Sequence, residues 1–441
     1  MDLLHYSSTG IGAVTEWDGR QVLIARPNTK VYGHMALEMA MTLALAREMN
    51  ADVYFDSDKT AANPALFDLD ATGVTVLRPR GLRQLTFRNV LRRRLVESKG
   101  RAGWDEYLRT TRVDVAREMA RQAGNADYPK ELRERLRKIS KRVGAGPHRY
   151  WKKLDQQPTT KSHDHVLYYR RRLLRDPVPV HLRPETAGPT DQAAKALGIT
   201  RDTKVVAVHA RSPGFKGGWD IQDIKVGSRD ESFRNVRLES YFDAIDYLVG
   251  EGYTVVRIGD PSMDPVRRRG VIDLATSSQR TAALEVYVLL RSEFLMVGDS
   301  GPHLVSYLTN TPLLMVNATD PVLVYPVRGD GLYLLKTIVD LDTGRELQLP
   351  ELLTDTYYSR LRSPKQYRYR ANTSDEIVAA VQEMVAQLQS PGFESQAQSK
   401  YRQAVTNACD NLTNKFVRKW SSDDGFLGEG RAVQFYANRW F

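Results

Sequence analysis

The stretch EFLMVGDSGPHLVSYLTNTPLLMVN, residues 293–317 of a chain of 441 residues, decides the predicted fold. An apolar run at 293–298 turns through two glycines into a helix-like segment at 302–308, and a second apolar run follows at 312–317. Strands that are apolar throughout are typical of a parallel sheet with helices on both faces. The stretch therefore predicts a strand, helix, strand unit of an α/β protein.

The same alternation continues on the N-terminal side of this stretch. Apolar runs at 205–210 and 254–259 predict two more strands, and residues 238–250 and 281–290 have the composition and length of helices. Strands and helices thus alternate, and each strand is an unbroken apolar run. A sheet of this kind is doubly wound and parallel.

The first half of the chain predicts a smaller sheet of the same type. Strand-like runs at 21–26 and 52–55 flank a helix-like segment at 34–49, and a third run follows at 74–79. Residues 176–190 contain four prolines and one glycine, which predicts an extended linker. Two Rossmann-like units joined in this way leave a cleft between the carboxyl ends of their strands.

These patterns divide the chain into three parts. The last helical stretch, 375–420, is expected to cross back and brace the first domain, and 421–441 is rich in aromatic residues and unassigned. We predict an N-terminal domain (1–180) with a basic helical insertion (78–175), a C-terminal domain (181–375), and C-terminal helices with a tail (376–441).

The excess of positive over negative charge lies entirely within the predicted insertion. The net charge is +11, but residues 78–175 hold 28 Lys and Arg against 10 Asp and Glu, so the rest of the chain is net acidic. Basic runs at 92–94 and 170–172 are interleaved with aromatic residues such as Trp104 and Trp151. Such a surface attracts polyanions or an anionic membrane face, although a set of solvated helices has the same pattern. Basic and aromatic residues together also describe nucleic-acid binders, so that class stays open.

Composition narrows the class of protein. Apolar residues make up 41% and charged residues 27%, which is typical of a folded globular chain. No run approaches the roughly 18 to 20 apolar residues that span a bilayer, and the first residues lack the layout of a signal peptide. The single cysteine, Cys409, allows neither an internal disulfide nor a multi-thiolate zinc site. We expect a cytoplasmic protein with peripheral contact at the inner membrane face.

The loop at 298–303 is the strongest candidate site. It lies where a buried strand turns into a helix, at the carboxyl edge of the predicted sheet, where such sheets bind ligands. Its glycines permit tight turns, Ser300 is expected to cap the helix, and the free N–H groups of the first helical turn suit a phosphate. We expect the ring of His303 to donate to a phosphate oxygen. The alternative is an ordinary capped helix start with a surface histidine.

This loop and the residues around it resemble a known protein family. The run GDSGPHLVSYLTNTPLLMVNATDP (298–321) resembles the donor-side loop of GT-B glycosyltransferases, notably the heptosyltransferase-like group, which has a D-[ST]-G-x-x-H segment before a helix. Residues 233–260 and 271–278 resemble a bacterial family of surface-carbohydrate glycosyltransferases, marked by an Arg-Asn pair, a Tyr-x-x-Ala-Ile helix and a Gly-Tyr-x-Val-x-Arg-x-Gly strand. The segment NTKVYGHMALE at 28–38 is similar to the acceptor-side Gly-His turn of that family. One departure is that residues 209–213 read HARSP where an Arg-Asp pair is expected.

The resemblance implies a GT-B glycosyltransferase whose donor is a nucleotide sugar. Transfer of the sugar builds negative charge on the departing phosphate, which GT-B enzymes stabilise with basic side chains and a helix N-terminus instead of a metal. The chain has both near the expected strand ends. The expected donor-binding residues are His209, Arg211, Lys216, Arg234, Asn235, Gly259, Asp260, Asp299, Ser300, Gly301 and His303.

Several of these residues also have a plainer interpretation. The planar guanidinium of Arg211 suits bidentate phosphate binding, which a lysine does not offer. Arg211 or Lys216 can instead pair with an acidic neighbour such as Asp220 or Asp230. Asp260 either binds a ribose hydroxyl or caps a turn.

The acceptor hydroxyl needs a base, and the first domain offers one. His34 follows a glycine at the expected start of a helix, and Glu38 lies one turn further on the same face. We expect His34 to be the base and Glu38 the reserve, although a His-x-x-x-Glu spacing is common in helices without any catalytic role. A zinc site at His34 and Glu38, or at His163 and His165, lacks a third and fourth ligand.

The sequence therefore favours metal-independent, inverting transfer without a cofactor, to a glycan, a lipid-linked or another anionic acceptor. The chain has no P-loop, no strand-linked G-x-G-x-x-G and no G-x-S-x-G motif, which removes the usual support for an NTPase, a dehydrogenase or an α/β-hydrolase. Two alternatives stay open: a nucleic-acid-binding protein on a nucleotide-sugar fold, and a nucleotide-sugar epimerase.

Overall fold

The computed structural model describes residues 10–17, 20–27, 29, 31–48, 50–55, 61–77, 134, 171–212, 232–360, 366–413 and 426–441. The chain divides into two compact units, the first formed by residues 1–168 with 178–181 and the second by residues 169–177 with 182–441. Most of the predicted basic insertion, including the run at 92–94, lies outside the described residues, as does Lys216.

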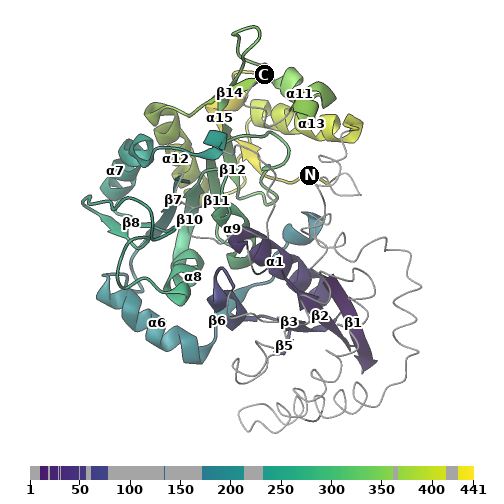
Figure 1. Ribbon diagram of the computed structural model, residues 1–441, viewed down its shortest axis with the longest axis vertical. Coiled ribbons are helices and arrows are strands. Elements are labelled where there is room, and N and C mark those ends of the chain that lie inside the picture. The colour runs from purple at the N-terminus through teal and green to yellow at the C-terminus, as the bar shows by residue number, and fades with distance from the viewer. Residues whose placement is uncertain are drawn as a thin grey trace. The chain divides into compact units, whose positions relative to one another are not determined.

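The first unit is built on a four-stranded sheet (Figure 1). Its strands are β1 (Gly10–Trp17), β2 (Arg20–Arg26), β3 (Asp52–Phe55) and β5 (Val76–Leu77), in the order β1-β2-β3-β5. β1 runs antiparallel to β2, and the other pairs are parallel. The predicted strands at 21–26 and 52–55 are confirmed, and the third, predicted over 74–79, begins at Val76, with 78–79 outside the described residues.

A single long helix joins β2 to β3 in this unit. It is α1 (Tyr32–Glu48), and nearly all its residues from Gly33 to Ala46 are buried. Ala, Met and Leu on every side of the helix explain this, because a helix that is apolar all round has no face suited to water. A further pair of short strands, β4 (Leu69–Ala71) and β6 (Val180–Leu182), forms a separate two-stranded sheet.

The second unit contains a seven-stranded sheet in which every neighbouring pair is parallel. The strand order is β15-β12-β11-β10-β7-β8-β9. Numbered along the chain from β7, this is the order 3-2-1-4-5-6-7 of a Rossmann-type sheet. The strands are β7 (Val205–His209), β8 (Thr254–Arg257), β9 (Val271–Asp273), β10 (Ser292–Val297), β11 (Leu313–Ala318), β12 (Leu332–Leu335) and β15 (Arg431–Ala432).

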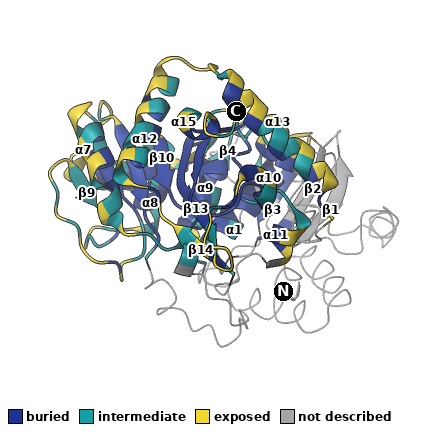
Figure 2. Cartoon of the chain, turned by 90° about the horizontal axis from the view of Figure 1, so that it is seen from above, coloured by how far each residue is buried: buried dark blue, intermediate teal, exposed yellow. Residues whose placement is uncertain are grey.

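Helices cover both faces of this sheet, so the buried strands lie between two helical layers (Figure 2). On one face α7 (Phe242–Gly250) packs against α12 (Ser374–Gln389). On the other face α8 (Ala282–Arg291) packs against α6 (Pro184–Ala196) and α9 (Pro302–Thr309). The predicted doubly wound parallel sheet is thus confirmed for this unit, whereas the cleft between the two domains stays a prediction.

The predicted extended linker at 176–190 is wrong, because this segment contains β6 and the first half of α6. Pro184 is the first residue of the helix, where a missing N–H costs nothing. Pro189 lies inside the helix, and the residue before it is Gly188, which has no Cβ to clash with the proline ring. Thr190 Oγ1 also donates to the main-chain oxygen of Thr186 at 2.6 Å. Proline content alone therefore misjudged the segment.

Within the predicted helical stretch 375–420, the helices Ser374–Gln389 and Gln396–Asn411 are confirmed as parts of the second unit, whereas 414–420 lie outside the described residues. α12 contacts β11, and α13 (Gln396–Asn411) contacts β15 and α15 (Gln434–Ala437). The unassigned tail thus supplies the edge strand of the large sheet. Bracing of the first domain stays a prediction. The remaining strands and α-helices that are described are the antiparallel pair β13 (Thr337–Asp340) and β14 (Tyr367–Arg370), and between them in the chain the short helices α10 (Leu349–Leu352) and α11 (Asp355–Arg360).

None of the described helices has the length and apolar character needed to cross a membrane.

Candidate functional site

The candidate site lies between the carboxyl ends of β7 and β10, in the second unit. β8 and β9 follow β7 on one side of it, while β10, β11 and β12 lie on the other, so the chain reverses direction across the sheet between β7 and β10. Open α/β sheets bind ligands in the crevice at such a switch point, outside the carboxyl ends of the strands. His209 is the last residue of β7, and the loop 298–301 follows β10.

A hydrogen bond joins these two strand ends. His209 Nε2 lies 3.0 Å from Ser300 Oγ, and His209 Nδ1 lies 3.1 Å from the main-chain oxygen of Ile258. A carbonyl oxygen only accepts, so Nδ1 carries the proton and Nε2 accepts from the serine hydroxyl. Burial in the sheet lowers the pKa of His209 to about 4, so the ring is neutral at physiological pH.

The predicted capping role of Ser300 is wrong. Helix α9 begins after Gly301 and has no side-chain cap, because the serine hydroxyl is bonded to His209. The first turn of α9 also has fewer free donors than predicted. Pro302 has no N–H, and the N–H groups of His303 and Leu304 already donate to the main-chain oxygens of Ser300 and Gly301 at 3.1 and 3.0 Å.

His303 is not the surface histidine of the plainer interpretation, because it is 7% exposed. Its Nδ1 lies 2.6 Å from the main-chain oxygen of Ser300, so Nδ1–H is already used as a donor. Burial lowers the pKa of His303 to about 4 against the opposing effect of Asp299. In this neutral form the ring has no second N–H to give to a phosphate, and the predicted phosphate-donor role of His303 stays a prediction.

Asp299 is paired within the site. Arg234 donates from Nε to the main-chain oxygen of Asp299 at 2.9 Å, and its Nη2 lies 3.1 Å from the Asp299 carboxylate. Thr319, just after β11, donates its hydroxyl to the other carboxylate oxygen. Asp299 thus ties the Arg234 segment to the ends of β10 and β11. The structure brings together His209, Arg234, Asp299, Ser300 and His303 as predicted neighbours.

Lys336 was missed by sequence reasoning. It directly follows β12 and is 3% exposed, and its ammonium donates to the main-chain oxygens of Phe233 at 2.7 Å and Asn235 at 3.1 Å. Burial lowers its pKa to about 8, and the charge of Asp299 opposes that shift. A lysine directly after the apolar run LYLL at 332–335 is the signal that would have found it.

A second missed feature is a reciprocal pair of asparagines near the same edge. Asn317 in β11 has a positive φ of 55°, and its N–H donates to Asn372 Oδ1 at 2.6 Å. The N–H of Asn372 donates back to Asn317 Oδ1 at 2.7 Å, and the side-chain amide of Asn317 donates to the Tyr241 hydroxyl at 3.3 Å. Such strained positions persist only where surrounding bonds hold them.

The other predicted donor-site residues in the described chain also lie at this edge. Arg211 is 9% exposed, and its main-chain oxygen accepts from Val236 N at 3.1 Å, which places Asn235 near the end of β7. Gly259 has a φ of +153°, and a Cβ there would lie 3.2 Å from His209 Nδ1. Asp260 accepts from Ser262 N at 2.9 Å, so it caps a turn, as its plainer interpretation held.

The predicted base pair lies in the first unit. His34 is half-buried in the first turn of α1, and Glu38 is 1% exposed in the second turn. The purely structural alternative for this spacing, a buried or capping histidine beside an exposed glutamate, does not fit Glu38, because Glu38 is buried. The role of both residues stays a prediction.

One basic residue of the insertion is buried rather than part of a charged surface. Arg171 is 6% exposed, and its guanidinium donates to the main-chain oxygens of Val322 at 3.2 Å and Tyr325 at 2.6 Å. The prediction of a basic surface is therefore wrong for Arg171. The reason is that it lies in the segment that enters the core of the second unit.

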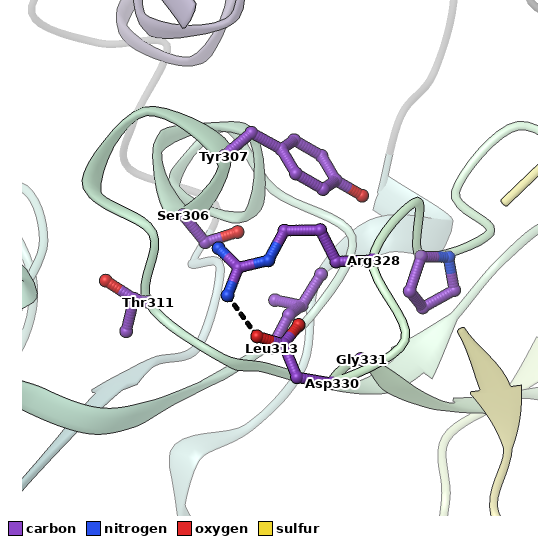
Figure 3. A pocket seen from close by; sticks show the side chains of 8 residues that line it. Ser306, Tyr307, Thr311, Leu313, Arg328, Asp330 and Gly331 are labelled. Carbon is purple, nitrogen blue, oxygen red and sulfur yellow. Dashed lines mark hydrogen bonds and ion pairs between the residues drawn. The ribbon is translucent and has the colours of Figure 1, made fainter. Parts of the chain in front are cut away.

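A shallow surface hollow lies at the opposite, amino edge of the sheet (Figure 3). It is lined by residues before β11 and β12, among them Thr311 and Gly331. Arg328 in its wall is paired with Asp330 and donates to the main-chain oxygen of Asn310 at 3.0 Å. The hollow is thus far from the strand ends that carry the candidate site. Within the described ranges, no group of three or more His, Cys, Asp or Glu side chains is arranged to hold a metal ion.

The sheet order defines an α/β protein whose second unit has a Rossmann-type sheet, with the candidate site at its switch point. No protein-family model matches the chain, and no curated protein matches it. A solved structure of a glycosyl transferase family 9 protein from Veillonella parvula DSM 2008 is 12% identical, with 85% of this chain and 99% of that chain covered at a TM-score of 0.41. The E. coli ADP-heptose LPS heptosyltransferase II is 11% identical, with 84% and 99% covered at a TM-score of 0.39.

Proposed function

We propose that this chain is a glycosyltransferase that moves a sugar from a nucleotide-sugar donor to a hydroxyl acceptor. The observation that carries the proposal is the convergence of Arg211, Arg234 and His209 with the loop 298–303 at the switch point of a Rossmann-type sheet. Basic groups there suit a diphosphate, and the loop has the sequence pattern of a sugar-nucleotide donor loop.

The proposed reaction is a single displacement. The acceptor oxygen forms a bond to the anomeric carbon as the bond from that carbon to the diphosphate oxygen breaks, and the nucleoside diphosphate leaves with the electron pair. The acceptor proton passes to a base, for which we propose His34, with Glu38 in reserve. Negative charge on the leaving diphosphate is stabilised by Arg211 and Arg234, without a metal.

The first test is a panel of nucleoside diphosphates and their sugar conjugates in a thermal-shift assay. We expect the nucleotides of one particular nucleobase to raise the Tm of the wild-type protein, and the others to leave it unchanged. Arg211→Ala is expected to weaken affinity for that diphosphate at least tenfold, because a buried guanidinium at the end of β7 is lost. Arg345→Ala is the matched control, since this arginine is half-exposed and paired with Glu351. Full affinity and transfer in Arg211→Ala would contradict the proposed clamp.

The basic block at 78–175 supports an anionic acceptor or a membrane surface as partner. We propose that the protein works in the cytoplasm and contacts the inner membrane face through this block. Vesicles with anionic lipid are expected to retain the protein at low salt and release it at high salt. Steeply salt-dependent oligonucleotide binding without any nucleotide-sugar binding would favour the nucleic-acid alternative instead.

A further inference from the structure

Two buried histidines determine the hydrogen-bond polarity of the loop 298–303. His209 donates its Nδ1–H to the main-chain oxygen of Ile258 at 3.1 Å, and His303 donates its Nδ1–H to that of Ser300 at 2.6 Å. Neutral imidazole has only one N–H, so the Nε2 atom of each ring has a lone pair and acts as an acceptor. Burial lowers the pKa of both rings to about 4, which agrees with the neutral form.

The hydroxyl proton of Ser300 is already used in a hydrogen bond. The hydroxyl donates to His209 Nε2 at 3.0 Å, so its oxygen has only lone pairs left for a ligand. The side chain is nearly buried, with 7% of the residue exposed, and it comes from the loop rather than from the helix. A ligand at the switch point therefore meets an acceptor at Ser300.

A second acceptor is Nε2 of His303, in the first turn of α9. Within the described part of the chain, its Nε2 has no hydrogen-bond partner, although the residue is only 7% exposed. The charged groups that act on the ring are Asp299, Arg234 and Arg171. Arg234 donates to the main-chain oxygen of Asp299, and Arg171 donates to those of Val322 and Tyr325.

A phosphate is poorly matched to this pair of acceptors. At neutral pH the diphosphate of a nucleotide sugar has acceptor oxygens and no donors, so it would face the lone pairs of Ser300 and His303. The first turn of α9 does little to change this, because Pro302 has no N–H and the next two N–H groups are already bonded. Sugar hydroxyls have protons to donate and match the pair.

We infer that Ser300 Oγ and His303 Nε2 form a hydroxyl-reading pair that binds the sugar of the donor, while basic side chains bind its diphosphate. The inference rests on the proposed function, and it names the part of the donor that each group recognises. It makes His303 a residue that determines sugar specificity, instead of a phosphate ligand.

The affinity test compares a nucleoside diphosphate with its sugar conjugate by calorimetry. His303→Phe removes the acceptor and keeps a ring of similar size. We expect it to weaken binding of the nucleotide sugar about tenfold and to leave that of the diphosphate within about twofold, and His303→Gln, which keeps an acceptor, to recover part of the loss. His181→Phe, at an exposed histidine in β6, is the matched control and is expected to change neither affinity.

A second measurement determines directly which ring nitrogen of each histidine carries the proton. In ¹⁵N-histidine spectra at neutral pH we expect His209 and His303 to be neutral with the proton on Nδ1, both before and after the diphosphate binds. An imidazolium at His303 in the diphosphate complex, or an equal loss of both ligands in His303→Phe, would overturn the inference and leave the proposed function standing. A wild-type protein that binds no nucleoside diphosphate or nucleotide sugar would overturn both.

Discussion

The ammonium group of Lys336, directly after β12, lies 2.7 Å from the main-chain oxygen of Phe233 and holds the segment that contains Arg234. Its second bond, to the main-chain oxygen of Asn235, fixes the other side of Arg234. Arg234 in turn pairs with Asp299 in the loop after β10. Lys336 is therefore a positioning residue for the candidate site, although it lies 101 residues from Asn235 in the chain.

Lys336→Met is expected to weaken nucleoside diphosphate binding at least tenfold and to cost about 2 kcal/mol in the free energy of unfolding, because two carbonyls lose their donor. Calorimetry and urea unfolding measure these effects. Lys195→Met is the control, since this lysine is largely exposed and pairs with Asp191 on the surface of α6. An unchanged affinity in Lys336→Met would show that Arg234 is positioned without it.

Asp299→Asn is expected to destabilise the second unit by about 3 kcal/mol, because it leaves the Arg234 guanidinium without its charged partner in a mostly buried site. The Arg234 side chain is 17% exposed and that of Asp299 is 6% exposed, so solvent screens the pair only weakly. Urea unfolding monitored by tryptophan fluorescence measures the effect. Thr319→Val removes only the hydroxyl that donates to Asp299 and is expected to cost about 1 kcal/mol. Equal losses in the two variants would contradict this account of the pair.

Gly259→Ala is expected to lower stability by about 1 to 2 kcal/mol, since a φ of +153° is strained for any residue with a Cβ. The new Cβ would lie 2.6 Å from Met263 Sδ and 3.2 Å from His209 Nδ1. Adding Met263→Ala should recover the steric part of the loss and not the backbone part. Thermal unfolding of the single and double variants separates the two. Full recovery in the double variant would mean that the backbone contributes nothing.

Acid is expected to destabilise the second unit through its two buried histidines. Their pKa is lowered to about 4, whereas a histidine in the unfolded chain titrates near 6.5. The unfolded chain thus binds protons first as pH falls, so the stability present above pH 6.5 declines and is lost as pH passes through about 4. Each ring contributes up to about 3 kcal/mol. Urea unfolding at pH 7 and pH 4.5 should show a smaller pH dependence in His303→Gln, and an identical dependence in wild type and variant would contradict this assignment.

Much of the second unit could be predicted because the evidence for it is local. The run of apolar residues that makes β10 and β11, and the residues that begin α9, are neighbours in the chain, so periodicity and length were enough. The same reasoning found the strand at 52–55 to the residue. It failed at 176–190, because prolines are tolerated in the first turn of α6 and after a glycine, which composition does not reveal.

The chemistry of the site could be predicted only in part. The loop 298–303 was found because its glycines, serine and histidine are adjacent in the chain, but the predicted capping role of Ser300 was wrong. Ser300 bonds to His209, which is 91 residues away, and not to the helix that follows it. Lys336 was missed because its partners, at 233 and 235, approach it only once β12 takes its place in the sheet.

The fold class and the location of the site follow from patterns within short stretches of this chain, since the alternation of apolar runs and helices is set by neighbouring residues. Which groups of the site donate hydrogen bonds and which accept them does not follow from such patterns. Which nitrogen of His209 and of His303 carries the proton depends on carbonyl groups that the strand order and the turn after β10 place against each ring. Only the packed sheet decides whether these side chains donate or accept, because burial removes the water that would otherwise satisfy either form.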